Sequence, residues 1–232
     1  MYKLILTLAL AGFVSSGCGS ARFKEQDQVN SIQKAAVVAL GVYQPAREGG
    51  MLGTRSGKLM LDSPHATGIY KDLVAELQKN MSWKMSTYDQ VRANSTFAQA
   101  YEKTMKGFQN KVPPGEGENL YRAEGILDQD SPRILGVEGR NALIDALKVD
   151  AIVVVTVRTQ LKGTVVMGIG PRKPQALVTF AVYKRGQEKP VWFDGMIEGV
   201  ASEESVGVIG NKELLDQLVA KSSKTAFAKI MK

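Results

Sequence analysis

Two residues stand out as candidates for chemistry. Cys18 is the only cysteine of the sequence, and His65 is the only histidine. A lone cysteine cannot form a disulfide within the chain, and one thiol cannot build a cysteine-based metal site. A lone histidine excludes zinc ligation by several histidines of one chain. His65 follows Pro64 in a predicted loop, so we interpret it as an exposed side chain and not as the base of a Ser-His-Asp or Cys-His arrangement. The thiol of Cys18 remains.

The residues before Cys18 have the order of a secretory leader. The positive start Met1-Tyr2-Lys3 precedes an uncharged apolar run from Leu4 to Val14, and the small residues 15–17 close the run. An apolar run of about eleven residues is too short to cross a bilayer, which takes about 20. A buried N-terminal helix is the alternative, but the run has no polar face. We therefore predict a signal peptide over residues 1–17.

The stretch Ser15-Ser16-Gly17-Cys18 resembles the lipobox of bacterial lipoproteins. In that family the cysteine sulfur receives a diacylglycerol and the leader is cut before it. The resemblance therefore implies that Cys18 is lipidated, with acyl chains such as palmitate holding the protein to a membrane. The residue after Cys18 is Gly19 and not an aspartate. By resemblance to enterobacterial lipoproteins, this implies the outer membrane and a periplasm-facing domain. Ser15 and Gly17 also suit an ordinary signal peptidase, which would leave a secreted protein with a free thiol.

Composition and charge limit the partners. The chain of 232 residues has a formal net charge of +7, and its lysines and arginines are dispersed. We expect no nucleic-acid partner for an exported protein. We interpret the basic excess as a generally basic soluble surface, and attraction to anionic cell-wall polymers or lipid head groups is the alternative. The length suits one large domain or two small ones.

Hydrophobic spacing divides the rest of the chain. Residues 18–33 are polar and charged, which predicts a lipidated cysteine followed by a flexible tether. Residues 34–232 then form one domain. Its strands are expected over 35–43, 83–88, 151–157, 175–183 and 190–199, and its helices over 68–81, 94–108, 121–127, 137–147 and 212–231, with a long loop over 44–66. We predict an α/β fold, a single mixed β-sheet flanked by helices, with a C-terminal amphipathic helix.

Three features in this order resemble a known group of envelope proteins. They are the early strand Ala35–Val42 with its following helix, the passage from Ala142 to Val154, and a hairpin holding Val191-Trp192-Phe193 before the last helix. The layout is similar to the α/β domain of penicillin-binding-protein activator lipoproteins, curli-secretion channel lipoproteins and the amino-terminal domain of the Tol-system β-propeller protein. Members act by binding other envelope components or by assembling, so the resemblance implies no catalytic residues.

Patterns that suggest catalysis are incomplete. The stretch Gly53–Lys58 is one residue short of a phosphate loop, and Gly168-Ile169-Gly170 lacks the third glycine of a dinucleotide site. The acidic pairs are interpreted as solvated charge, since a paired-carboxylate hydrolase needs two such groups across a cleft. Trp83 and Trp192 are interpreted as core residues rather than binding anchors. We therefore predict no enzyme, no cofactor and no metal. The acidic pairs are Asp128 with Asp130 and Glu203 with Glu204.

Three functions compete on this basis. The first is an outer-membrane lipoprotein that acts as a non-enzymatic binding or assembly factor for a periplasmic or envelope protein partner. The second is a subunit of an oligomeric secretion channel, whose barrel would need an amphipathic strand such as Thr164–Ile169 from each copy. The third is a cell-wall hydrolase, which would need two carboxylates facing one pocket.

Overall fold

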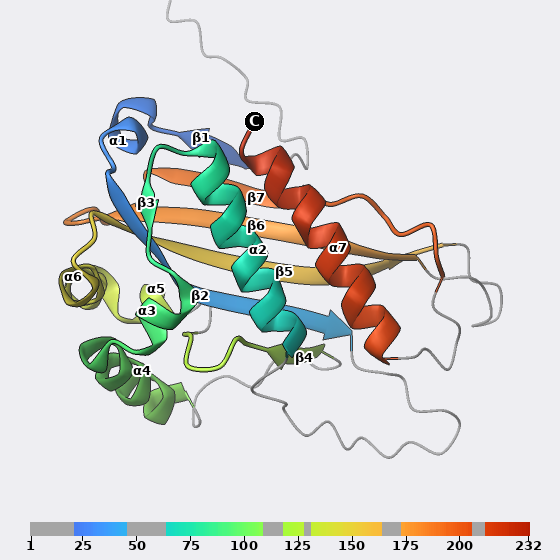
Figure 1. The fold of residues 1–232 in the computed structure, drawn as a ribbon, viewed down its shortest axis with the longest axis horizontal. Coiled ribbons are helices and arrows are strands. Elements are labelled where there is room, and N and C mark those ends of the chain that lie inside the picture. Colours follow the sequence, from blue (N-terminus) through green and yellow to red (C-terminus); the bar gives the residue numbers. More distant parts are fainter. Residues whose placement is uncertain (1–20, 46–63, 109–117, 128–130, 164–172, 206–211) are drawn as a thin grey trace, which may run out of the picture.

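The structure is a computed structural model, and it describes residues 21–45, 64–108, 118–127, 131–163, 173–205 and 212–232 (Figure 1). Their strands form one mixed sheet in the order β1-β7-β6-β5-β2-β3, and β4 pairs with the far end of β2. The α/β fold class and the single mixed sheet predicted from the sequence are confirmed. The strands are β1 (Arg22–Lys24), β2 (Lys34–Pro45), β3 (Lys84–Met85), β4 (Glu118–Tyr121), β5 (Ala151–Lys162), β6 (Lys173–Lys184) and β7 (Trp192–Glu198).

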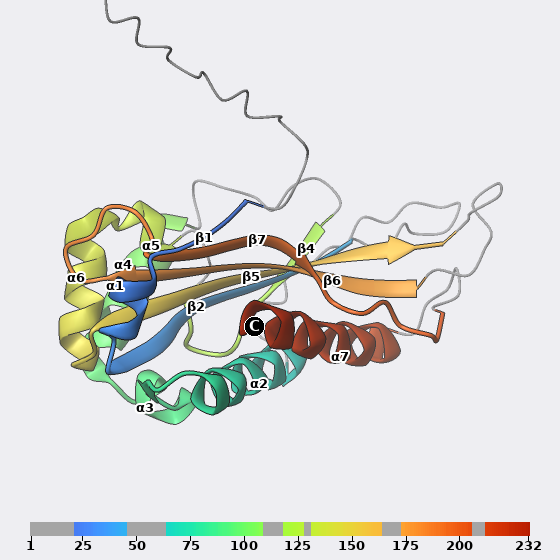
Figure 2. The ribbon, with the colours of Figure 1, turned by 90° about the horizontal axis from the view of Figure 1, so that it is seen from above.

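Helices cover the two faces of this sheet unequally. The long helices α2 and α7 lie side by side across one face, whereas α4, α5 and α6 gather at the end where β5 begins (Figures 1 and 2). The rest of the second face, beside β6 and β7, has no helix of the described residues over it. The helices are α1 (Gln26–Asn30), α2 (Pro64–Asn80), α3 (Tyr88–Arg92), α4 (Ser95–Phe108), α5 (Ser131–Ile134), α6 (Gly136–Leu147) and α7 (Lys212–Ile230).

The parallel pair β2 and β5 forms the centre of the core. Residues 35–40 and 151–155 are all buried, which matches their unbroken apolar sequence, because a central strand of an α/β sheet is enclosed on both faces. The register shifts at Val38, whose carbonyl accepts a hydrogen bond from the Leu127 amide at 3.1 Å. The bulge therefore ties the segment before Leu127 to the edge of the central strand.

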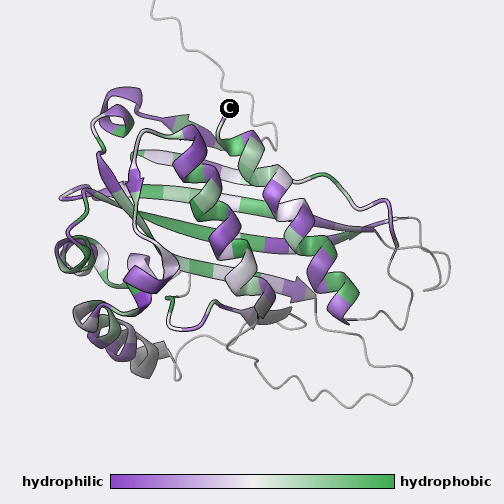
Figure 3. Cartoon of the chain, viewed as in Figure 1, coloured by the Kyte–Doolittle hydropathy of each residue, from purple (hydrophilic) through white to green (hydrophobic). Residues whose placement is uncertain are grey.

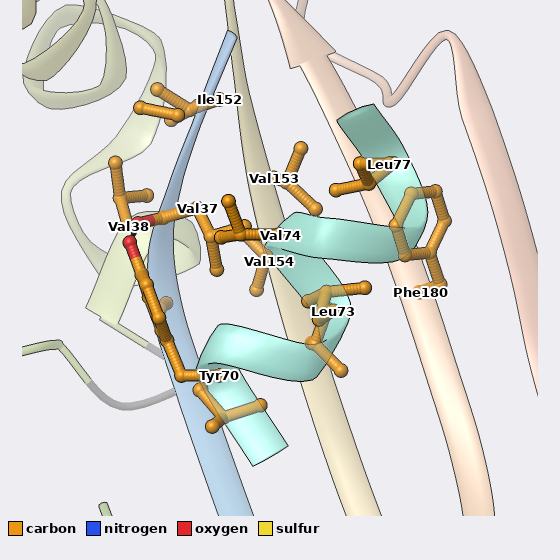
Figure 4. Close-up of a cluster of buried hydrophobic side chains, with 14 of the residues drawn as sticks. Val37, Val38, Tyr70, Leu73, Val74, Leu77, Ile152, Val153, Val154 and Phe180 are labelled. Carbon is orange, nitrogen blue, oxygen red and sulfur yellow. Dashed lines mark hydrogen bonds between the residues drawn. The ribbon is translucent and has the colours of Figure 1, made fainter. Parts of the chain in front are cut away.

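Helix α2 packs on this pair through one apolar stripe. Leu73, Val74 and Leu77 point into the sheet beside Val153 and Phe180 (Figure 4). The buried Tyr70 hydroxyl donates to the Val37 carbonyl at 2.7 Å. Burial raises the pKa of Tyr70, so its hydroxyl stays protonated and keeps donating.

Helix α7 is amphipathic, as predicted, with alternating apolar and polar surface along its length (Figure 3). Its buried side is held to the sheet by a serine as well as by apolar residues. The Ser222 hydroxyl accepts from the Ala176 amide at 2.9 Å and donates to the Val200 carbonyl at 2.8 Å. This bridge draws the helix backbone close to Gly199. The apolar residues of the buried side are Leu218, Val219, Ala226, Phe227 and Ile230.

The predicted flexible tether is wrong from residue 22 onward. Arg22–Lys24 forms β1, which pairs with β7 at the edge of the sheet, and Gln26–Asn30 forms helix α1. The backbone continues this attachment, because the Glu25 amide donates to the Val191 carbonyl at 2.9 Å. Val29 and Ile32 are fully buried. The folded domain therefore begins near residue 21 rather than at residue 34.

A second correction concerns residues 121–127, which were predicted as a short helix. The structure has β4 up to Tyr121, followed by an extended segment and a turn at Gly125, where φ is +69°. Strand pairing wins here because β4 adds to the exposed edge of β2. By contrast, helix α4 begins as predicted, and the Asn94 side chain accepts from the Phe97 amide at 2.9 Å.

Several predictions lie outside the described residues. They concern the leader, Cys18, the loop between β2 and α2, and the turn between β5 and β6. Among the residues that the structure describes, no helix is both long and apolar enough to cross a bilayer.

We expect two glycine substitutions to change stability in opposite directions. Gly199→Ala would place a methyl group 2.1 Å from the Ser222 carbonyl oxygen, so the free energy of unfolding should fall by about 2 kcal/mol or more. Gly68→Ala lies within α2 with no atom within 4 Å of the new methyl, so the free energy should rise by about 0.5–1 kcal/mol. Urea unfolding of the domain measures both. Equal stability of the two variants would contradict this packing.

Candidate binding surface

The start of the folded chain limits how far Cys18 can lie from the sheet. Cys18 itself is outside the described residues, but Ala21 is not, and its carbonyl accepts from the Gly195 amide at 2.9 Å. Cys18 precedes Ala21 by three positions. A fully extended chain of that length spans at most about 11 Å. The cysteine is therefore held close to the β1–β7 edge of the sheet.

An ion pair reinforces this edge. Arg22 Nε lies 2.7 Å from an oxygen of Asp194, whose side chain is fully buried, and Arg22 also donates to the Ile230 carbonyl at 3.3 Å. The first strand is thereby tied both to β7 and to the end of α7. The Trp192 indole donates to the second oxygen of Asp194 at 3.0 Å. Removing one partner from a buried pair is strongly destabilising, because the other charge remains uncompensated.

The charges of this cluster influence one another. Burial raises the pKa of Asp194, and the Trp192 hydrogen bond together with Arg22 and Lys24 only partly offsets that effect. Lys24 lies over the Trp192 ring with Nζ 3.9 Å from the ring centre. Burial and then repulsion from Arg22 lower the pKa of Lys24. The cluster is thus a structural unit on the helix-covered face, where it closes the β1 edge.

The opposite face of this edge is apolar and exposed. Phe23 stacks on Phe193 with 6.0 Å between ring centres, and Phe23 is 43% exposed. Met196 is 51% exposed and has a φ of +59°, a left-handed conformation that is rare for residues other than glycine. Its amide lies 3.4 Å from the Thr179 hydroxyl, at the point where the β6–β7 register shifts. Apolar side chains therefore lie on this face beside the place where the chain enters the fold.

Polar and cationic residues continue across the same face. Because side chains alternate along a strand, the residues paired as Arg158 with Leu177 and Gln160 with Gln175 point away from α2 and α7. The exposed Arg158 lies over Tyr43, with 5.4 Å between the guanidinium carbon and the ring centre. Gln160 donates to Gln175 at 2.7 Å. We call this surface, with Phe23, Phe193 and Met196 at its β1 edge, the uncovered face.

One ion pair lies at the far end of the uncovered face. Lys162 Nζ is 3.0 Å from a Glu198 oxygen, and this hydrogen bond lowers the pKa of Glu198. Lys173 is opposite Lys162 in the register and is exposed. Among the residues of β5, β6 and β7 that point to this side, the cations are Arg158, Lys162 and Lys173, and the acidic side chain is Glu198. The uncovered face is therefore basic.

The structure separates the residues considered for catalysis. His65 was predicted to lie in a loop, but it lies in the first turn of α2. Its Nε2 is 3.2 Å from a Glu213 oxygen. Glu203 and Glu204 are exposed. The described residues contain no group of three or more His, Cys, Asp or Glu side chains able to hold a metal ion. Asp128, Asp130, Gly53–Lys58 and Gly168–Gly170 lie outside the described residues.

Both tryptophans are buried core residues, as predicted. Trp83 and Trp192 meet edge to face with 6.3 Å between ring centres, and the Trp83 indole donates to the Val29 carbonyl at 3.2 Å. Sequence reasoning missed β1, Asp194 and Met196. A signal for β1 was present, since Phe23 is a large apolar residue between two cations in a segment interpreted as tether.

Comparisons with known proteins do not place the chain in a family. No protein-family model matches it, and a search of curated proteins finds no significant match.

The raised pKa of Asp194 predicts a pH dependence of stability. A carboxyl group whose pKa is raised by folding contributes stability below its unfolded pKa of about 4, and this contribution is lost as pH rises through the folded pKa. Asp194→Asn removes that titration but keeps an oxygen for the Trp192 indole. Relative to the native protein, the variant should become more stable as pH rises from about 4 to 7. Urea midpoints across this range measure the difference, and a difference that moves the opposite way would refute the assignment.

Proposed function

We propose that this protein is an outer-membrane lipoprotein that faces the periplasm and acts as a non-enzymatic binding factor for another envelope protein. One observation carries the proposal. The lone cysteine that ends the leader stands three positions before Ala21, whose backbone already bonds to β7. A lipid on Cys18 would thus hold a folded domain directly at the membrane surface, without a long tether.

The leader and the fold support the proposal independently. The apolar run before Cys18 is too short to remain in the bilayer as a spanning helix. This suits a leader that is cut off when Cys18 receives its lipid. One acyl chain gives only marginal membrane binding, whereas two or more give stable anchoring. A diacylglycerol on Cys18 meets that requirement. The resemblance to envelope domains that act by binding or assembling supports the same role.

Replacement of Cys18 tests the anchoring directly. We expect Cys18→Ser to move the protein from the membrane fraction to the soluble fraction, because the variant has no sulfur to receive a diacylglycerol. Intact mass of the native protein extracted from membranes should show that residues 1–17 are absent and that lipid mass is present. A native protein that keeps Met1, or a serine variant that stays with the membrane as firmly as the native protein, would contradict the proposal.

Cross-linking in intact cells tests the binding role. Exposed lysines on α7, such as Lys221 and Lys224, offer amines to a lysine-reactive reagent. We expect a discrete heterologous adduct from the native protein, and at least about a fivefold smaller yield from Cys18→Ser because anchoring raises the local concentration. Adducts at regular multiples of the chain mass would instead favour the channel-subunit alternative. Recovery of the monomer alone would contradict a binding factor.

A further inference from the structure

The uncovered face has the chemistry of a surface that rests on lipid. We propose that this face lies against the anionic headgroups of the bilayer that holds the lipid on Cys18. The inference rests on the proposed lipid anchoring and adds to it an orientation for the domain. It also gives the basic charge of the chain a location and a ligand, namely phosphate groups at a membrane surface.

The length of chain before Ala21 sets the distance to the membrane. The headgroup layer on each side of a bilayer is about 5–8 Å thick, and the chain from Cys18 to Ala21 spans at most about 11 Å. Ala21 is bonded to Gly195, so the β1–β7 edge must lie at or just above the headgroups. The remaining question is which surface of the domain turns toward the headgroups.

The two faces of the β1 edge are not equivalent as lipid contacts. On the helix-covered face, the Arg22–Asp194 pair, Lys24 over Trp192 and the end of α7 occupy the edge. On the uncovered face, the apolar side chains are the exposed Phe23 and Met196 and the partly buried Phe193. Exposed apolar side chains next to an anchor gain burial only if their own face turns to the bilayer.

The backbone at Met196 supports the same orientation. A left-handed residue at a bulge is accommodated most easily by glycine, yet this position holds a large apolar side chain that is half exposed. The exposed half of this side chain gains no burial within the domain. Insertion of the thioether among lipid headgroups and upper acyl chains gives the side chain an apolar environment.

Charge complementarity selects anionic lipid over a neutral surface. Beyond the apolar edge, β5 and β6 present Arg158, Lys162 and Lys173. Glu198 is the one acidic side chain that β5, β6 and β7 present there, and it is already paired with Lys162. Each cation near an anionic membrane adds to attraction, and the effect extends over about one Debye length, roughly 8–10 Å. Phe23 and Arg158 therefore contribute two different interactions to one contact.

Oxidation of Met196 in reconstituted vesicles tests this orientation. The lipidated protein would be extracted, placed in vesicles of phosphatidylethanolamine with phosphatidylglycerol, exposed to hydrogen peroxide and mapped by mass spectrometry. We expect sulfoxide at Met196 to form about fivefold more slowly than in Cys18→Ser protein mixed with the same vesicles, because lipid shields the thioether. Met81 directly follows α2, which lies across the other face of the sheet, so it provides an internal reference and should oxidise equally in both.

Variants separate the apolar and charged contributions. Phe23→Ser with Arg158→Ala should reduce the protection of Met196 to less than about twofold, because both contacts with lipid are lost. Ile134→Ser with Lys221→Ala, a matched pair at exposed positions outside the uncovered face, should keep the native protection. In vesicles of phosphatidylcholine, the protection of Met196 should also fall for the lipidated protein without substitutions. This tests the contribution of the anionic headgroups without changing the protein.

The outcomes distinguish this inference from the anchoring itself. If the lipidated protein floats with vesicles but Met196 oxidises as fast as in Cys18→Ser, the anchoring stands and the orientation is overturned. If protection appears without vesicles and grows with protein concentration, a second copy occupies the face and the inference also fails. If the extracted protein carries no lipid and does not float, the proposed function fails first.

Discussion

The pairing of β1 with β7 is the constraint on which the account depends. Three residues add to an edge of the sheet, and the ion pair between Arg22 and the buried Asp194 holds them there. Because the same arginine also reaches the Ile230 carbonyl, the start of the domain and the end of α7 are fastened at one place. Without this pairing, residues 18–33 would be a tether of about 50 Å when extended, and an anchor on Cys18 would say little about orientation.

The two faces of the sheet divide the work of the domain. The face under α2 and α7 provides the core. Tyr70, Phe180 and Trp192 are buried there, and the Tyr70 hydroxyl and the Trp192 indole are hydrogen-bonded. The uncovered face contributes less to the core, and its side chains change from apolar at the β1 edge to cationic along β5 and β6. A lipid-anchored protein needs a surface that tolerates the bilayer and leaves other surfaces for a protein partner, and α2 and α7 point away from the proposed membrane contact.

The long elements could be predicted from the sequence because their hydrophobic spacing is strong. The strand from Ala151, helix α4 with its Asn94 cap, and α7 all agree with prediction. The short elements could not. Strand β1 has a single large apolar residue, Phe23, and its stability comes from Asp194, which is about 170 positions away in sequence; such contacts leave no local pattern. Residues 121–127 were predicted as a helix, but Tyr121 ends β4 and an extended segment with a turn at Gly125 follows. The hydrogen bonds that β2 supplies to β4 leave no pattern in the spacing. The left-handed conformation of Met196 had no local signal either, since glycine precedes it rather than occupying the position.

Hydrogen exchange at the β1–β7 edge tests the central claim most directly. The amides of Glu25 and Gly195 both donate across this edge, to Val191 and Ala21 respectively. The account predicts that both exchange at least about a hundredfold more slowly than unstructured amides, and that Arg22→Ala accelerates both by removing the partner of Asp194. Exchange of these two amides at the unstructured rate, in a protein whose central strands stay protected, would show that the chain after Cys18 is a free tether and would contradict the account.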